Sequence, residues 1–410
     1  MKACLLTVLR TAASLIALGA YTGVAAGGFD FSALQQLIDK KQVSSIEELL
    51  PQLPTVFKAG YVLVFDSRSL QQASFTNPRV IMFGSDAKFI LTFNGDPSQR
   101  GFDTLETMEF DADSAQFVFR EIEFRHSAPG IQAKAVYSRD NPEKCEICHG
   151  SPARPVWDAY PTWPGVYGEQ YLRPLTAHER SGLAEFLVRH SSHTRYRSLF
   201  YLERYVRPVT FHPDTREQYQ GSLTEPPNST LNTLLGRKNL LALSAQIQRA
   251  GRFNAYRYAL LASLNADCTP DDHVPARVRA SYGTPFSDFA ERTRQLDLWL
   301  QERKDLRSLS PTRAHAKESL DRFRYLVEEG LGLSTTQWTM ALEKNTFDFS
   351  MKESAAAELE AMLLAVVVDT DPDIRNLREA GAVSNNGRYC AYLRRKSMTS
   401  FDVIHTTAPH

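Results

Sequence analysis

Three side chains of the types that can bind metals or cofactors lie within one helical turn of this sequence. Cys145, Cys148 and His149 belong to the segment Cys-Glu-Ile-Cys-His, and positions i, i+3 and i+4 share one face of a helix. This set suits covalent attachment of haem, because each thiol adds to one vinyl group as a thioether while the adjoining imidazole ligates the iron. The segment occurs once, so we predict one covalent haem c per chain, with His149 as an iron ligand.

Two other uses of these residues compete with haem attachment. A Cys-x-x-Cys pair at a helix start is a candidate thiol redox site, and the charge of Lys144 favours a thiolate; no thioredoxin-type alternation of strands and helices surrounds it, however. A structural zinc ion is the other alternative, with His190 and His193 at i and i+3 as further ligands. Haem is favoured because only 10 of 410 residues are His, so a histidine directly after the second cysteine is uncommon by chance.

The first 26 residues have the features of a secretory signal peptide. Lys2 and Arg10 provide a positive start, residues 12–20 are apolar and small, and Val24-Ala25-Ala26 suits cleavage. The apolar run is too short to span a membrane core of about 30 Å. We therefore expect an exported bacterial protein, periplasmic or secreted, with no membrane span after cleavage.

The expected export bears on the cysteines beyond the signal peptide. An oxidising compartment favours pairing of free thiols. If haem takes Cys145 and Cys148, then Cys268 and Cys390 remain. They form either one disulfide or two buried free thiols, and the sequence leaves both possibilities open.

The charge of the chain gives no indication of an electrostatic partner. Lys plus Arg and Asp plus Glu both number 47, and the two signs are interspersed. This balance argues against nucleic acid and against an anionic membrane surface as partners.

The residue pattern changes along the chain in a way that predicts an α+β fold. After the signal peptide at 1–26, residues 27–140 form a β-rich domain with an antiparallel sheet of about five strands, one face of which is dry. Residues 141–174 are the attachment segment with its Pro, Trp and Tyr residues, and residues 175–410 form a larger all-helical domain.

Local signals place the individual elements. Capping boxes at Ser45 to Glu48 and at Thr176 to Glu179 predict helix starts, the second opening a helix to about residue 189. A break in the alternation of residues 116–124 indicates a bulge. The clearest strands are 61–65, 79–83, 88–93 and 116–124, and the further helices are 231–250, 253–265, 285–304, 313–329 and 352–368.

The segment after His149 is rich in proline and in aromatic side chains that require burial. We expect these side chains to cover a haem face, and Arg154 to pair with a propionate. The alternative is an ordered loop that fills the gap between two domains. The aromatic residues concerned are Trp157, Tyr160, Trp163 and Tyr167.

The pentapeptide from Cys145 to His149 resembles that of the c-type cytochromes. With the segment from Arg154 to Gly168, the chain is similar to an uncharacterised group of exported bacterial haem proteins, over about residues 50–168. The resemblance implies haem attachment outside the cytoplasm and brings no established activity. We expect a mono-haem protein that transfers electrons to a redox partner protein, more plausibly than a substrate-converting enzyme.

The second axial ligand of the iron would distinguish an electron carrier from a haem enzyme. The resemblance to small c-type cytochromes implies a methionine some tens of residues after the motif, yet none occurs between His149 and Met340. An open position would instead suit a peroxidase-like enzyme or a sensor of small ligands. The candidate ligands are His178 and His193 first, then His126, His190, His212, Met82, Met108 and Met340.

Overall fold

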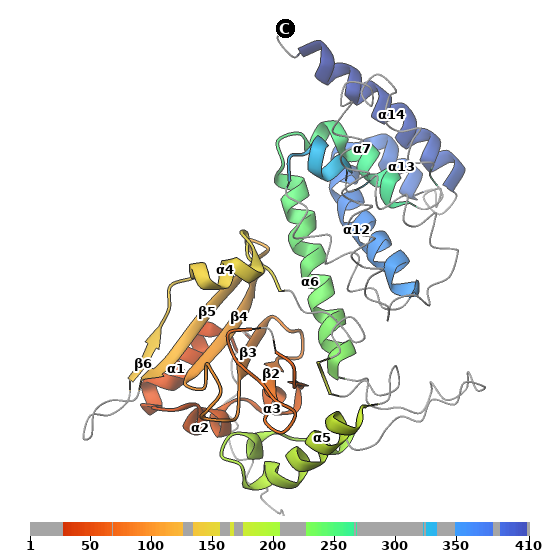
Figure 1. Ribbon diagram of the computed structural model, residues 1–410. Helices are drawn as coiled ribbons and strands as arrows, with labels where there is room; N and C mark the ends of the chain where they lie inside the picture. Colours follow the sequence, from red (N-terminus) through yellow and green to blue (C-terminus); the bar gives the residue numbers. More distant parts are fainter. Residues whose placement is uncertain are drawn as a thin grey trace, which may run out of the picture.

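The computed structural model is an α+β protein, as the sequence predicts: a six-stranded antiparallel sheet is followed by a helical region (Figure 1). The structure describes residues 28–67, 69–125, 134–155, 165–167, 175–205, 227–265, 268, 323, 325–333, 349–379 and 386–407. The predicted signal peptide, the predicted helix over 285–304 and most of that over 313–329 lie outside these residues.

Three short helices and one 3-10 turn precede the sheet. The N-cap of α2 is Ser45, as predicted, because its hydroxyl accepts a hydrogen bond from the backbone N–H of Glu48 at 3.2 Å. The Glu48 carboxylate bonds to the N–H and hydroxyl of Ser44 rather than to Ser45, so the predicted capping box is only half formed. The elements are α1 (Phe31–Lys41), α2 (Ile46–Leu49), η1 (Leu50–Gln52) and α3 (Thr55–Ala59).

The sheet is a meander in which each strand pairs antiparallel with the next one along the chain. Four of its strands coincide with the predicted ones. Two more are not placed individually by the sequence: β4 is interrupted by polar residues, and β6 is only four residues long, so both give a weak signal. The strands are β1 (Tyr61–Val64), β2 (Arg79–Phe83), β3 (Phe89–Phe93), β4 (Thr104–Asp111), β5 (Gln116–Arg125) and β6 (Lys134–Tyr137).

Both faces of the sheet are packed, whereas the sequence predicts only one. In β5, Phe117 and Phe119 pack on the face that carries helix α4, which we call the α4 face, and Ile122 and Phe124 pack on the opposite α1 face. The pairing of β4 with β5 is continuous, so the predicted bulge is absent from the described strand. The break in alternation reflects a change of the buried face along one regular strand.

The α1 face is covered by α1 to α3 and by the chain from α5 (Ala177–Arg189) to residue 205. The capping box of α5 is complete: the Thr176 N–H donates to Glu179 Oε2 at 2.6 Å, and the Glu179 N–H donates to Thr176 Oγ1 at 3.3 Å. Residues 175–205, assigned above to the helical domain, therefore pack with the sheet, because their apolar side chains complete its core. The 3-10 turns here are η2 (His190–Ser192), η3 (Tyr196–Ser198) and η4 (Leu202–Tyr205).

The helical region begins with α6 (Pro227–Arg249), which runs from the sheet to the remaining helices (Figure 1). Helices α6, α7 and α12 confirm three predicted helices. A disulfide joins Cys268, just after α7, to Cys390 in α14. The other elements are α7 (Phe253–Leu264), the π-helix η8 (Leu326–Gly330), α12 (Phe349–Thr370), α13 (Pro372–Glu379) and α14 (Asn386–Thr407).

Within the described part of the chain, no helix is long and apolar enough to cross a membrane.

Candidate cofactor-attachment site

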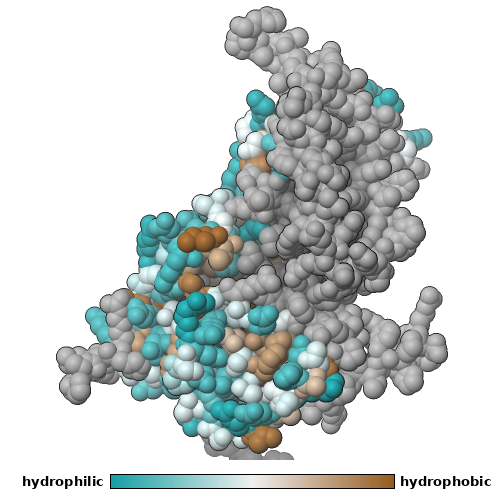
Figure 2. Space-filling model, in the orientation of Figure 1, coloured by the Kyte–Doolittle hydropathy of each residue, from teal (hydrophilic) through white to brown (hydrophobic). Residues whose placement is uncertain are grey.

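Helix α4 (Glu143–His149) contains the whole Cys-x-x-Cys-His segment and confirms the predicted helical turn. Pro142 stands at its N-cap, where a missing N–H costs nothing. The helix ends at Gly150, whose φ of 77° lies in the region that favours glycine. None of the residues of α4 is buried, and Ile147 is 79% exposed. Figure 2 shows apolar surface where α4 crosses this face of the molecule.

His149 is held by one hydrogen bond and one ring contact. Its Nδ1 lies 2.7 Å from the carbonyl oxygen of Arg154, and its ring centroid lies 4.1 Å from that of Phe119, at an interplanar angle of 30°. Burial lowers the pKa of His149 to about 4, so the ring is neutral at pH 7. Because a carbonyl oxygen only accepts, Nδ1 carries the proton and the lone pair is on Nε2.

The two cysteines of α4 are free thiols in different environments. Cys148 is exposed, while Cys145 is half-buried and packs against the core of the α4 face. Burial raises the pKa of the Cys145 thiol to about 11, and Glu121 and Glu106 raise it further. A thiol redox site needs a lowered pKa, so the environment of Cys145 does not suit the thiol alternative.

Charged residues on the α4 face lie beneath helix α4. No functional motif is recognisable in the sequence of the sheet strands. Glu121 in β5 is directly opposite Glu106 in β4. Arg79 Nη2 pairs with Glu106 Oε2 at 2.7 Å, and Lys144 pairs with Glu121. Glutamates at inward positions of strands could have signalled this cluster, but pairing them requires the register of β4 and β5.

The histidines proposed for zinc are placed on the other side of the sheet from α4. The Nδ1 atom of His193 accepts from the N–H groups of Arg195 and Tyr196, at 3.2 and 3.4 Å, and its ring stacks on Tyr196. His190 Nδ1 bonds to the carbonyl of Leu187 at 2.6 Å. Among the described residues, no group of three or more His, Cys, Asp or Glu is arranged to hold a metal ion.

The structure brings none of the described candidates for a second axial ligand to His149 by direct contact. His178 is exposed on α5, and α5 and α4 lie at opposite ends of the sheet domain (Figure 1). Met82 is buried on the α1 face, whereas Met108 is on the α4 face, directly opposite Phe119 in the neighbouring strand. His126, His212 and Met340 lie outside the described residues.

Tyr167 belongs to the protein core, which corrects the expectation that it covers a haem face. Its ring centroid lies 4.6 Å from that of Phe65, and its hydroxyl donates to the carbonyl of Phe75 at 2.9 Å. The backbone there is anchored to β1, since the Tyr167 N–H donates to the Leu63 carbonyl at 2.9 Å. The other three aromatic residues of the segment, Trp157, Tyr160 and Trp163, lie outside the described residues.

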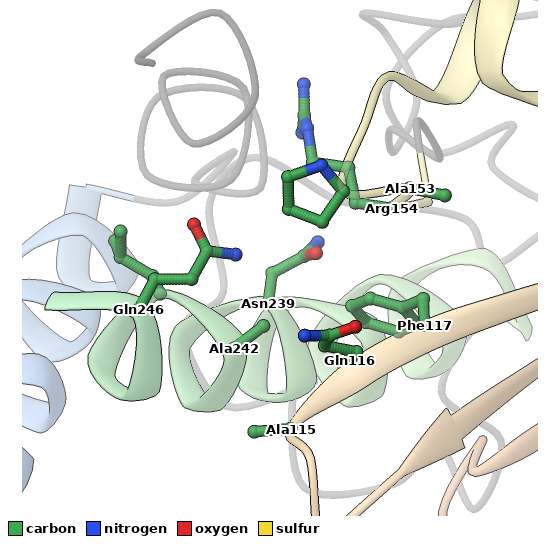
Figure 3. Close-up of a pocket in the computed structure, with 10 residues that line it drawn as sticks. Ala115, Gln116, Phe117, Ala153, Arg154, Asn239, Ala242 and Gln246 are labelled. Carbon is green, nitrogen blue, oxygen red and sulfur yellow. The ribbon is translucent and has the colours of Figure 1, made fainter. Parts of the chain in front are cut away.

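A small cavity lies beside the attachment segment, between residues 152–154, the start of β5 and helix α6 (Figure 3). The amide groups of Gln116, Asn239 and Gln246 point toward it, while the guanidinium group of Arg154 extends away from Asn239. Its volume of about 20 Å³ has room for roughly one water molecule. The cavity therefore suits a bridging water better than part of a large cofactor.

The residues of α4 fit covalent haem in the identity of their donor atoms, in the free state of the two thiols and in the neutral state of the imidazole. Both thiols are unpaired with each other, the other two described cysteines are joined in a disulfide, and His149 has its free lone pair on Nε2. Comparison with protein-family models, with curated proteins and with solved structures finds no match.

Proposed function

We propose that this chain is an exported mono-haem c-type cytochrome that transfers electrons to a redox partner protein. Cys145 and Cys148 would form the two thioether bonds, and His149 would ligate the iron through Nε2. The observation that carries the proposal is the hydrogen bond between His149 Nδ1 and the Arg154 carbonyl. An imidazole that ligates a metal usually donates its other N–H in this way, which fixes the tautomer and the ring orientation.

Each residue of the site has a distinct part in this function. Haem bound here would supply one-electron exchange at its iron. Phe119 supports the His149 ring from the side of the sheet, and the Arg154 carbonyl orients it. Cys148 is exposed, so the attachment position is accessible to a partner protein. The disulfide between Cys268 and Cys390 supports an oxidising compartment, and hence periplasmic or secreted localisation.

The proposal is tested by producing the exported chain together with haem-attachment machinery. We expect a chromophore that stays with the polypeptide on a denaturing gel and gives sharp bands when reduced with dithionite. The variant Cys145→Ala/Cys148→Ala should lose the covalent chromophore, while the matched control Cys268→Ala/Cys390→Ala should retain it. Covalent haem in the first variant, or none in the wild-type protein, would contradict the proposal.

Carbon monoxide separates the two haem functions that the sequence allows. A reduced spectrum unchanged by carbon monoxide indicates a six-coordinate iron and supports electron transfer. A high-spin spectrum that shifts with carbon monoxide or peroxide would indicate an open iron position and replace the carrier by an enzyme or a sensor of small ligands.

A further inference from the structure

A buried and a partly buried carboxylate face each other across strands β4 and β5, directly beneath the attachment helix. Glu106 and Glu121 are register partners on the α4 face, and the residue Glu121 is only 6% exposed. Like charges directly opposite in a sheet destabilise it, and burying a carboxylate adds a desolvation cost. A pair that stands in this position despite such a cost is a candidate for a functional role.

The cations that pair with the two carboxylates do not cancel their field equally. Arg79 and Glu106 are both mostly buried, with side-chain exposures of 14% and 19%. Lys144, in contrast, is 54% exposed, while the side chain of its partner Glu121 is 8% exposed. Water and salt screen the exposed ammonium more strongly than the buried carboxylate. The negative charge of Glu121 is thus the less compensated of the two on the side that faces α4.

The electrostatic field of Glu121 and Glu106 acts on the cofactor-attachment residue Cys145. Lys144 and Cys145 are neighbours in α4, and Cys145 packs against the α4 face. After burial, Glu121 and then Glu106 are the largest causes of the raised pKa of the Cys145 thiol. Both carboxylates therefore act electrostatically on the atom that would anchor the cofactor.

We propose that Glu121, assisted by Glu106, lowers the reduction potential of the haem group carried by Cys145 and Cys148. The inference rests on the proposed function and deepens it. A fixed negative charge near a redox centre favours its oxidised, more positive form, and net charge and burial are two of the means by which proteins set such potentials. Glu121 and Glu106 are tuning residues in this scheme and need not touch the cofactor.

The test measures the midpoint potential of the haem-loaded full chain and of three single variants. A unit charge about 10 Å away at an effective dielectric constant of about 20 changes such an equilibrium on the order of tenfold. We expect Glu121→Gln to raise the equilibrium constant for reduction by about tenfold, or about 59 mV for one electron. The matched control is Glu109→Gln, because Glu109 pairs with Arg120 at 2.9 Å in the same strand pair but on the opposite face; it should change the constant less than about twofold.

A variant that removes a positive charge distinguishes an electrostatic effect on the potential from an effect of misfolding. Lys144→Gln removes a largely exposed cation, so the fold should persist, and it leaves the charge of Glu121 uncompensated. It should lower the equilibrium constant for reduction, whereas general loosening of the site would shift both variants in the same direction. Equal potentials for Glu121→Gln and Glu109→Gln, or a raised potential for Lys144→Gln, would overturn the inference.

A measurement on the haem-free protein separates failure of this inference from failure of the proposed function. In a Cys148→Ser background, the rate of alkylation by iodoacetamide against pH reports the pKa of Cys145, which Glu121→Gln should lower. If wild-type protein acquires no covalent haem, the proposed function fails, and the tuning inference fails with it. If covalent haem forms and the thiol pKa falls, yet the potential of Glu121→Gln is unchanged, only the tuning inference fails.

Discussion

The Nδ1 atom of His149 lies 2.7 Å from the carbonyl oxygen of Arg154, five residues further along the chain. This carbonyl belongs to the loop that follows α4, and the loop turns back on the helix end, since the Arg154 N–H donates to the His149 carbonyl at 3.1 Å. The bond holds the imidazole in a single neutral tautomer before any cofactor arrives. A preset ring orientation reduces the conformational entropy lost when the site binds its ligand.

The neutral state of His149 predicts a specific pH dependence of stability in the haem-free protein. Its pKa is about 4 in the folded state and about 6.5 when unfolded. The unfolded state therefore binds more protons below pH 6.5, and stability falls as the pH decreases from about 6.5 to about 4, by up to roughly 3 kcal/mol. Urea unfolding at pH 7 and at pH 4.5 measures this loss, and His149→Gln should reduce it. An equal loss in both proteins would contradict the assignment of a partly buried, neutral ring.

Arg195 makes hydrogen bonds to three residues of the sheet domain, and its replacement should strongly lower the free energy of unfolding. Its Nε pairs with Glu47 at 2.5 Å, and its Nη1 donates to the carbonyls of Asn94 and Phe102, at 2.6 and 2.8 Å. The side chain is fully buried, so Arg195→Met removes the donor to two backbone carbonyls and takes from Glu47 its cationic partner. We expect a loss of about 3–5 kcal/mol in the free energy of unfolding.

The control for Arg195 is its near neighbour Arg197, which is exposed. Arg197→Met should change the free energy of unfolding by less than about 0.5 kcal/mol. Chemical denaturation followed by circular dichroism measures both variants. Similar stabilities of the two variants would show that the buried hydrogen bonds of Arg195 contribute little.

The sequence predicted those features that depend on local signals. The capping box from Thr176 to Glu179 marks the start of α5 through residues that are neighbours in sequence. The helical turn from Cys145 to His149 is likewise local, since it depends on residue spacing and on Pro142 and Gly150 at its ends.

Features that depend on long-range packing could not be predicted in the same way. The change of buried face between Phe119 and Ile122 resembles a bulge in sequence, and only the coverage of both faces explains it. The approach of Glu121 to Glu106 depends on the register of two strands. The contact of His149 with Phe119 requires the sheet and α4 to be docked, which no local pattern encodes.

The loop after β3 packs so closely on the 3-10 turn η3 at Gly95 that a larger residue should not fit there. A Cβ atom on Gly95 would lie 1.9 Å from the hydroxyl oxygen of Tyr196, a fully buried side chain that donates to the Pro78 carbonyl at 2.8 Å. Gly95→Ala must displace this ring, and we expect a cost of about 1–3 kcal/mol in the free energy of unfolding. The control is Gly251→Ala, where no atom lies within 4 Å of the added Cβ. Equal melting temperatures for the two variants would contradict the close packing.

The disulfide between Cys268 and Cys390 should stabilise the helical region without affecting the attachment site. It joins residues 122 positions apart, and closing so long a loop restricts the unfolded chain strongly. We expect Cys268→Ser/Cys390→Ser to lower the free energy of unfolding by about 2–4 kcal/mol. Alkylation of the unfolded, haem-free mature chain should modify two cysteines before reduction and four afterwards.

The two cysteine pairs provide each other's control in this experiment. Cys145→Ser/Cys148→Ser in the haem-free protein removes an exposed and a half-buried thiol of α4, so it should change the unfolding midpoint much less than loss of the disulfide. Modification of four cysteines before reduction would mean that Cys268 and Cys390 are free thiols. The argument from disulfide to oxidising compartment would then fail, while haem attachment at Cys145 and Cys148 would still stand on its own test.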